Sequence, residues 1–572
     1  MKTILCSSYR VCSPLVLPSW YTSVGVETNF YYDRRNARES QRRKFHQSRE
    51  YHGQSRNSKN NLELSRLGGT IGALTIAGYL AWKKSTSNVA QLDAKKTPHE
   101  TGKHDQVLKH LPHFSRNQVA EHYDDSRRIW VSFRRGVYDV TEFVAVHPGG
   151  SRILMAAGGS LEPFWELYPV HQKSDVFQIL EKYRIGNLNE EDVVEAQEAV
   201  DHFKGEPMRH PALIRRADKP FNGETPPSLL TEKFHTPNDV FYVRNHLPVP
   251  QVDAKTYRLE IDGINLTETT FSLQDIKKFP KVSISATIQC GGNRRTEMGK
   301  DKVVAGLGWT GGAIGNAKWT GARLVDVLRS AGFKPEAYKH AKQLHVKFDG
   351  LDTDQSGECY GASVPLSYLL DGNFDAILAY EMNDKPIPID HGFPVRIVLP
   401  GIVGARSVKW LSRVSISEEE SQSPWQQRDY KVFSPSVSLE TVDFSAAPPI
   451  MDTPVTSYIC SHNNGDKVKK GPVKLQGYAF SGGGRGIVRV EISLDKGKTW
   501  NVARISDTAN LESTKNWSWV LWEANVNIQA NAEIWVKAVD SGYNQQPEDF
   551  NNIWNYRGLL STAYHKIYLE AR

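Results

Sequence analysis

The sequence has few cysteines, no C-x-x-C pair and no dinucleotide-binding fingerprint, and each shortage excludes a class of protein. Its five cysteines (Cys6, Cys12, Cys290, Cys359 and Cys460) are scattered over 572 residues, which excludes a disulfide-rich framework. The glycine-rich segment at residues 481–486 has no helix pattern after it. It is therefore typical of a loop between strands and does not indicate a nucleotide site.

An excess of basic over acidic residues is confined to the N-terminal region. Residues 1–84 hold 14 Lys and Arg against 5 Asp and Glu, so the net charge of +7 is concentrated there and the remainder is close to neutral. Nothing in this balance indicates a nucleic-acid-binding protein. At 572 residues the chain exceeds one hydrophobic core, and about 150 residues per domain predicts three or four units.

Residues 1–84 have the composition of a mitochondrial presequence. Residues 1–66 are rich in Arg and Ser and poor in acids. The uncharged run at residues 67–82 has 16 residues with four glycines, fewer than the ~20 needed to span a bilayer. We expect a two-part signal that sorts the protein to the mitochondrial intermembrane space, with membrane contact only during import. A retained inner-membrane anchor is the alternative.

Two histidines between residues 108 and 187 stand in settings that suit haem ligands. Residues 130–140 predict a strand, and after residues 141–146 a Pro-Gly-Gly turn exposes His147 at the tip of an element. His171 follows the aromatic stretch at residues 164–168. Two imidazoles from opposite walls of an apolar pocket would fill both axial positions of a haem iron, leaving electron transfer as the function. A lone His before Pro-Gly-Gly is as often an ordinary loop residue.

The strings at residues 137–143, 156–159 and 183–188 around these histidines resemble the cytochrome b5 family. The resemblance covers some 80 residues. It implies an α+β haem domain at residues 108–187, with haem b bound by His147 and His171. Residues 188–207 are acidic and polar, and they predict a flexible linker to the next domain.

Cys290 is the candidate metal ligand of the following region. Residues 282–288 alternate apolar with small or polar side chains, which predicts a strand that ends at Cys290, directly before Gly291 and Gly292. The neighbouring Arg294 and Arg295 would favour the thiolate, the form that binds soft metals. A cysteine by itself is more often a small buried hydrophobe.

The string Cys-Gly-Gly-Asn-Arg-Arg-Thr-Glu-Met from Cys290 resembles the molybdenum-ligand loop of the sulfite oxidase family, which usually has Ala at the position of Gly291. Further strings of this family stand at residues 241–250, 309–315, 350–352, 391–396, 404–410 and 425–430. The resemblance runs from about residue 206 to the C-terminus and points to the animal form, which carries its own haem. It implies a mixed α+β molybdopterin domain at residues 208–430.

The same resemblance assigns the site residues. It implies Cys290 as ligand of a molybdenum-molybdopterin cofactor. The implied catalytic residues are Arg244, Arg295, Trp309, Tyr430 and Arg557. The implied cofactor contacts are Tyr242, Val243, Arg244, Asn245, His246, Asp352, His391, Arg396, Ser407, Val408 and Lys409. The residue types agree, because guanidinium groups grip an anion with several equivalent oxygens, such as sulfite, through paired hydrogen bonds.

Residues 440–572 predict an immunoglobulin-like β-sandwich. Apolar residues alternate at residues 488–494 before the turn at residues 495–497, and the pattern returns at Trp517, Trp519 and residues 534–538. In the family this domain pairs two subunits, so a homodimer is expected. The fold class as a whole is predicted to be α+β and multidomain.

The implied activity is oxidation of sulfite to sulfate, with electrons leaving one at a time through haem b to cytochrome c. Two alternatives compete with it. One is a molybdoenzyme like eukaryotic nitrate reductase, in which the haem domain follows the molybdenum domain; here it precedes. The other is an inert scaffold that only carries haem, which the presence of Cys290, Arg244, Arg295 and Tyr430 disfavours.

Overall fold

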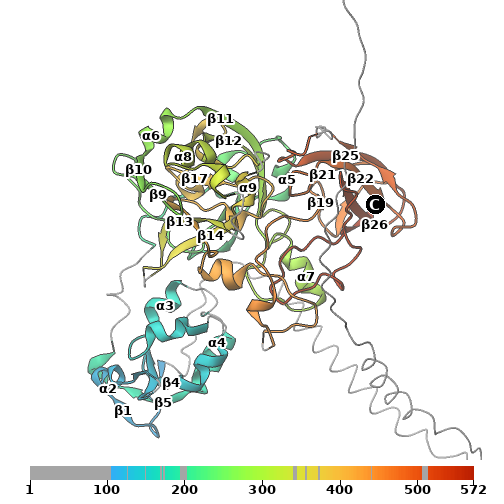
Figure 1. Ribbon diagram of the computed structural model, residues 1–572. Coiled ribbons are helices and arrows are strands. Elements are labelled where there is room, and N and C mark those ends of the chain that lie inside the picture. The colour runs from blue at the N-terminus through green and yellow to red at the C-terminus, as the bar shows by residue number, and fades with distance from the viewer. Residues whose placement is uncertain are drawn as a thin grey trace, which may run out of the picture. The chain divides into compact units, whose positions relative to one another are not determined.

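The computed structural model describes residues 105–124, 126–147, 150–167, 171, 174–193, 203–338, 344–354, 357–370, 374–439, 441–505 and 513–572. Figure 1 colours its elements along the chain. The predicted presequence at residues 1–84 and residues 194–202 of the predicted linker lie outside the described residues. Within the described ranges, no helix is long and apolar enough to cross a membrane.

The haem-type region is a small α+β unit built on one sheet. The strand order is β1-β5-β4-β3-β2, with β1 parallel to β5 and the other pairs antiparallel. The strands are β1 (His113–Phe114), β2 (Tyr123–Asp124), β3 (Arg128–Phe133), β4 (Gly136–Asp139) and β5 (Arg184–Leu188). The helices are α2 (Arg116–Ala120), η2 (Thr141–Val146), η3 (Gly150–Ala156), α3 (Glu162–Leu167), α4 (Ser174–Glu181) and η5 (Glu190–Asp192). Val131, Tyr138 and Trp165 lie in its core.

The prediction of one strand at residues 130–140 is wrong, because the chain forms the hairpin of β3 and β4 there. Arg134 turns the chain with a φ of +51°. A non-glycine residue with a positive φ is uncommon, so the residue type at position 134 does not signal a turn. The alternation continues on both sides of the turn, and the two strands are not separable by pattern.

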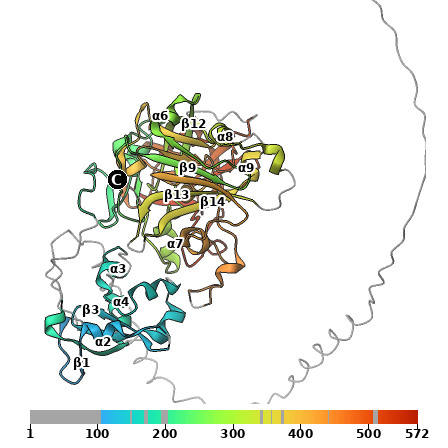
Figure 2. The same cartoon turned by 60° about the vertical axis from the view of Figure 1, so that its left-hand side comes forward.

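The central region contains two larger sheets and a small one. The first has the order β10-β9-β18-β13-β14, and Figure 2 shows β9, β13 and β14 within it. Its strands are β9 (Arg258–Gly263), β10 (Thr269–Ser272), β13 (His345–Thr353), β14 (Cys359–Pro365) and β18 (Leu411–Ser417). The second has the order β11-β12-β15-β16, with β17 also paired to β15. Its strands are β11 (Lys281–Gln289), β12 (Ile314–Arg323), β15 (Ile377–Met382), β16 (Lys385–Pro386) and β17 (Arg396–Val398).

The small sheet has the order β6-β7-β8 and brings the Arg244 segment beside the larger sheets. Its strands are β6 (Ile214–Ala217), β7 (Asn222–Glu224) and β8 (Val243–Arg244). The α-helices of the region are α5 (Pro227–Leu230), α6 (Leu273–Lys278), α7 (Arg295–Asp301), α8 (Leu324–Ser330) and α9 (Ser367–Leu370). The shorter helical turns are η6 (Asn238–Val240), η7 (Pro335–Tyr338), η8 (Ile389–His391), η9 (Gly404–Arg406), η10 (Trp425–Asp429) and η11 (Phe444–Ala446).

The largest hydrophobic core lies between the two larger sheets and under α6 and α8. Ile261, Phe348 and Val414 enter it from the first sheet, and Leu378 and Ile397 enter it from the second. A separate cluster containing Cys290 and Trp309 covers other residues of the second sheet. Side chains of this sheet are thus buried in two clusters, which fixes the position of the strand that carries Cys290.

The C-terminal region is a β-sandwich, as predicted. One sheet has the order β19-β21-β25-β24 and the other β20-β27-β26-β22-β23. The strands are β19 (Thr456–Ile459), β20 (Asp466–Val468), β21 (Gly471–Phe480), β22 (Ile487–Ser493), β23 (Asn501–Val502), β24 (Arg504–Ile505), β25 (Val520–Ile528), β26 (Ala532–Asp540) and β27 (His565–Ala571). Residues of both sheets share one apolar core. Residues 481–486 join β21 to β22, so the glycine-rich segment is a loop between strands.

Trp517 and Trp519 do not continue the strand pattern of the sandwich, which corrects the prediction. Both precede β25. The backbone carbonyl of Trp517 accepts a hydrogen bond from the Thr287 N–H at 2.9 Å, and the Thr287 hydroxyl accepts one from the Trp519 N–H at 2.8 Å. These residues therefore attach the sandwich to β11. The two tryptophans are two positions apart, as alternate residues of a strand are, but the residue that they contact, Thr287, belongs to another domain.

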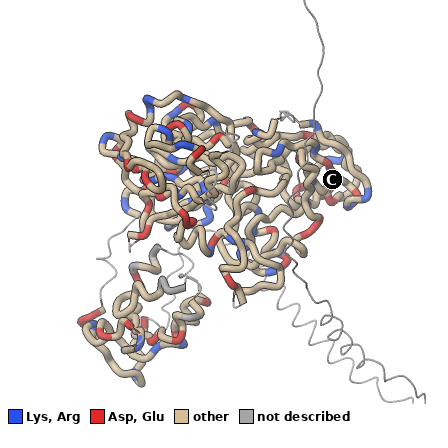
Figure 3. The backbone as a smooth tube through the Cα atoms, viewed as in Figure 1, with Lys and Arg blue, Asp and Glu red and all other residues tan. Residues whose placement is uncertain are grey.

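Lys and Arg are interspersed with Asp and Glu along the described chain (Figure 3). This distribution agrees with the near-neutral composition that follows residue 84. The candidate site therefore has to be found from local arrangements of charge, because the overall balance does not point to one face.

Candidate functional site

A cavity of about 620 Å³, including its open mouth, gathers residues from many separate segments. Its lining residues are Phe241, Tyr242, Arg244, His246, Ile288, Cys290, Asp352, Tyr360, His391, Arg396, Gly404, Ala405, Ser407, Lys409 and Tyr430. Ten of these are residues that the sequence assigned to the site. The remaining five were not selected: four stand inside or beside the quoted strings, whereas Tyr360 lies on β14, outside all of them.

Cys290 lies at the end of β11, where the sequence predicted it. Its N–H donates to the Ala313 carbonyl at 3.0 Å, and its Sγ accepts the N–H of Gly292 at 3.5 Å. The thiol is buried but lines the cavity. A Cβ added to Gly291 would lie 3.3 Å from Val403 and Ile450, an approach that a small shift relieves, so the family's usual Ala is compatible with this backbone.

The charged lining of the cavity is mainly cationic. Arg244, Arg396 and Lys409 face a single carboxylate, Asp352. Burial lowers the pKa of Arg396 to about 10 and also lowers that of Lys409, while burial raises the pKa of Asp352. Within the described residues, Asp352 Oδ1 and Arg396 Nε are buried and have no hydrogen-bond partner. A cavity with a soft thiol, cations and unsatisfied polar atoms fits an anionic metal cofactor with polar ring atoms.

The hydroxyl of Tyr430 shares a hydrogen bond with Nε2 of His246 at 2.7 Å. Burial lowers the pKa of His246 well below its ordinary value, and the charges of Arg244 and Lys409 act in the same direction. Burial raises the pKa of Tyr430, with Arg244 opposing. Both groups are therefore neutral near pH 7, and they form a polar pair on the cavity wall.

Tyr430 follows η10, a π-helical turn that Arg406 holds in place. The Arg406 guanidinium donates to the carbonyls of Trp425 at 3.2 Å and Ile450 at 3.1 Å, and to Oε1 of Gln426 at 2.6 Å. Arg406 is fully buried and ends η9, the turn whose glycine and alanine line the cavity. One side chain thus ties the Tyr430 segment to the cavity wall.

Arg295 and Arg557 lie beside this cavity and are not among its lining residues. Arg295 Nε donates to the Arg557 carbonyl at 2.9 Å, and Nη1 donates to the Leu307 carbonyl at 2.7 Å. Burial lowers the pKa of Arg295 to about 10, against the opposing charge of Cys290. Arg557 pairs with Asp429, the neighbour of Tyr430, at 2.8 Å. Its Nε is buried without a hydrogen-bond partner among the described residues.

Glycines make room for the Arg295 side chain. A Cβ at Gly292 would lie 2.7 Å from the Arg295 guanidinium carbon, and one at Gly306 would lie 2.8 Å from it. Arg294, by contrast, turns away and pairs with Glu297 at 2.6 Å. Of the two arginines expected to act on the Cys290 thiol, the geometry therefore favours Arg295.

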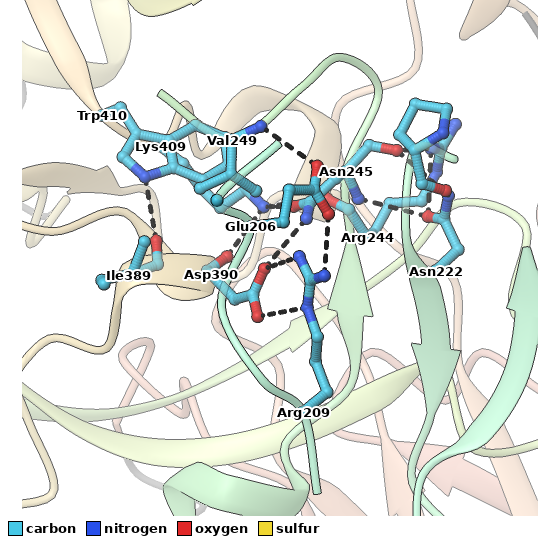
Figure 4. A network of polar contacts seen from close by, with 12 residues as sticks. Glu206, Arg209, Asn222, Arg244, Asn245, Val249, Ile389, Asp390, Lys409 and Trp410 are labelled. Carbon is cyan, nitrogen blue, oxygen red and sulfur yellow. Dashed lines mark hydrogen bonds and ion pairs between the residues drawn. The ribbon is translucent and has the colours of Figure 1, made fainter. Parts of the chain in front are cut away.

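The other predicted site residues lie near the cavity in supporting positions. Trp309 is fully buried in the Cys290 cluster, and its Nε1 has no hydrogen-bond partner within the described ranges. Val243 and Val408 are buried and do not line the cavity. Asn245 accepts a hydrogen bond from Lys409 and donates one to Asp390 at 3.0 Å (Figure 4). It therefore supports Lys409, a lining residue of the cavity, without lining the cavity itself.

The two predicted haem ligands lie together in the small α+β unit. The ring centroids of His147 and His171 are 6.3 Å apart and their planes differ by 10°. Two metal–nitrogen bonds of about 2.1 Å, plus ~1.1 Å from each nitrogen to its ring centre, separate two centroids by about 6.4 Å. Phe143 contacts His147 and Trp165 stacks on His171, which supplies apolar surroundings. The spacing fits one iron between the two rings.

Three regions of the chain match described families. Residues 115–189 match "Cytochrome b5-like Heme/Steroid binding domain", residues 246–425 match "Oxidoreductase molybdopterin binding domain", and residues 447–572 match "Mo-co oxidoreductase dimerisation domain". These matches correspond to the haem-type unit, the region of the cavity and the β-sandwich described above.

Comparison with individual proteins agrees with these family matches. The chain is 50% identical to "Sulfite oxidase, mitochondrial" of Homo sapiens, over 80% of this chain and 84% of the human protein. It is 35% identical to a nitrate reductase of Hordeum vulgare, but over only 63% of this chain and 42% of that protein. Among solved structures, the sulfane dehydrogenase SoxCD from Paracoccus pantotrophus is similar, with a TM-score of 0.52, 25% identity and coverage of 64% of this chain and 87% of that one.

Proposed function

This chain belongs to the sulfite oxidase family, and we propose that it oxidises sulfite to sulfate at the cavity around Cys290. The observation that carries the proposal is the arrangement of a buried thiol, the buried Arg396 and the half-buried Arg244 and Lys409 around one cavity. Cys290 would be the protein ligand of molybdenum. The pterin part of the cofactor would be held by residues of the cavity wall, with His391, Arg396 and Ser407 as its hydrogen-bond donors and Lys409 as a positive charge.

When bound, a molybdenum cofactor would supply two-electron redox chemistry at the cavity, and haem b would supply one-electron transfer. The chain's own residues bind and orient the substrate. Arg244 supplies positive charge at the cavity, with Arg295 and Arg557 beside it, and a sulfite dianion is attracted electrostatically. Tyr430 offers a hydroxyl oriented by His246, which would orient a substrate oxygen without undergoing bond changes.

The haem-type unit would provide the outlet for electrons. His147 and His171 would hold the haem between them, which would leave no position for substrate, so the group would supply electron transfer only. We propose cytochrome c as the acceptor. The protein is mitochondrial like its named relatives, and the basic composition of residues 1–66 followed by the uncharged run at residues 67–82 supports the intermembrane space, where this acceptor would be met. Residues 447–572 would pair two subunits into a homodimer.

The nitrate reductase alternative is disfavoured on two grounds. That relative is more distant, and the haem match at residues 115–189 precedes the molybdopterin match at residues 246–425. The scaffold alternative predicts a protein without turnover. Comparison of sulfite and nitrate as substrates of the purified full-length protein therefore separates all three functions.

The test of the metal ligand is Cys290→Ser, with Cys359→Ser as the matched control. A hydroxyl stays protonated at neutral pH and is a poor ligand for a soft metal, so Cys290→Ser should abolish sulfite oxidation and leave the haem absorbance unchanged. Cys359 is half-buried on β14 and lies outside the cavity lining, so its serine variant should retain turnover. Near-normal turnover of Cys290→Ser would overturn the proposed site.

A further inference from the structure

Arg209 stands outside the cavity but is bound tightly to its wall. Its Nε and Nη2 form a paired contact with the carboxylate of Asp390, at 2.9 and 2.8 Å (Figure 4). Its Nη1 contacts Glu206 at 2.7 Å, and its guanidinium carbon lies 4.4 Å from the ring centroid of Phe221. The side chains of Arg209 and Asp390 are 12% and 10% exposed, so this ion pair is largely shielded from water.

Asp390 connects Arg209 to two cationic residues of the cavity. Its Oδ1 accepts a hydrogen bond from the Asn245 amide at 3.0 Å, and its backbone carbonyl accepts one from Lys409 Nζ at 2.9 Å. Lys409 Nζ also donates to the Arg244 carbonyl at 3.0 Å and to the Asn245 side chain. A continuous path of polar contacts therefore runs from Arg209 to Lys409 and Arg244, which both line the cavity.

The charges along this path support one another. Burial lowers the pKa of Lys409, and Asp390 is the largest opposing influence, since its negative charge favours the ammonium form. Burial would raise the pKa of Asp390, but hydrogen bonds and charge from Arg209 outweigh it, so the pKa is lowered. Without Arg209, the Asp390 carboxylate would be buried with Lys409 as the remaining cation that acts on it most strongly. Lys409 would then be drawn toward that carboxylate and away from its three present acceptors.

We propose that Arg209 is a positioning residue of the cofactor cavity, which fixes Asp390 and thereby holds Lys409 and the backbone of Arg244 in place in the cavity wall. The inference rests on the proposed cofactor role of that cavity. It also gives a role to the residues at the end of the predicted linker and just after it, because Glu206 and Arg209 attach this part of the chain to the wall of the site.

The test uses the full-length protein with Arg209→Met, and the double variant Arg209→Met/Asp390→Asn. Truncating one partner of a buried charge pair leaves the other unpaired, so the molybdenum-to-haem ratio of Arg209→Met should fall about tenfold and its KM for sulfite should rise. In the double variant the unpaired carboxylate is gone, and the ratio should return to within about threefold of wild type.

Arg215→Met is the matched control. Arg215 also forms an i,i+3 ion pair, with Asp218, and lies over the ring of Phe221, but its side chain is 69% exposed and is not on the path to the cavity. Its variant should keep the wild-type metal ratio.

Two results would overturn the inference. The first is a wild-type molybdenum-to-haem ratio in Arg209→Met. The second is a double variant whose ratio is no higher than that of Arg209→Met, while haem absorbance and thermal midpoint are normal in both variants. If Cys290→Ser behaves as expected and Arg209→Met does not, only this inference fails. If Cys290→Ser keeps its turnover, the proposed function fails first.

Discussion

Replacing Tyr430 with Phe is the sharpest test of how the cavity wall acts on the substrate. Tyr430 is 6% exposed, and the substitution keeps its ring and removes only the hydroxyl that lies 2.7 Å from His246 Nε2. His246 is then left without that partner in a half-buried position. An unsatisfied buried polar group costs about 1–3 kcal/mol. If the loss is expressed in the transition state, kcat/KM should fall by about 5-fold to 150-fold.

The assay is steady-state sulfite oxidation with an artificial acceptor that takes electrons directly from the molybdenum centre, so that electron transfer through the haem does not limit the rate. Tyr360→Phe is the control, because Tyr360 also lines the cavity and its ring lies 4.7 Å from that of His246. Its hydroxyl donates to the Ala405 carbonyl at 2.8 Å instead of contacting His246. Tyr360→Phe should therefore lose less activity. A Tyr430→Phe variant within twofold of wild type, or an equal loss in Tyr360→Phe, would refute the reasoning.

Three further results are expected. Arg244→Gln should raise the KM for sulfite at least tenfold, since a contact to a partly desolvated dianion is worth on the order of 2–5 kcal/mol; kcat/KM within about twofold of wild type would contradict this. His171→Ala should abolish cytochrome c reduction but leave the direct artificial acceptor active, and loss of both would show that the two centres do not act separately. Burial lowers the pKa of His565 to about 3, so the folded state stays neutral while the unfolded chain binds a proton below about pH 6.5. Stability should therefore fall as the pH drops from about 6.5, by up to about 1.4 kcal/mol per pH unit from this residue, and His565→Gln should flatten the urea midpoint between pH 7 and 5.

The elements that short-range patterns specify were predictable from the sequence. The alternation before Cys290 predicted a strand that delivers the thiol at its end, and β11 has this form. The alternation around Val490 and the turn before Gly497 likewise predicted β22 and its following turn. These predictions work because side-chain alternation and turn residues act within a few positions of the chain. The hairpin at Arg134 was missed because such predictions depend on these local signals. The residue with positive φ in its turn is neither glycine nor proline.

The tertiary structure alone decided which separate segments meet. The sequence assigned Arg244, Cys290 and Tyr430 to one site only through their resemblance to a family, and no local pattern brings them to one cavity. Tyr360 belongs to no motif, and it enters the lining because β14 pairs beside β13. The contact between Arg209 and Asp390 joins residues 181 positions apart. Such contacts depend on how buried faces pack together. The sequence pattern shows which residues form each buried face, but it does not show which faces pack against each other.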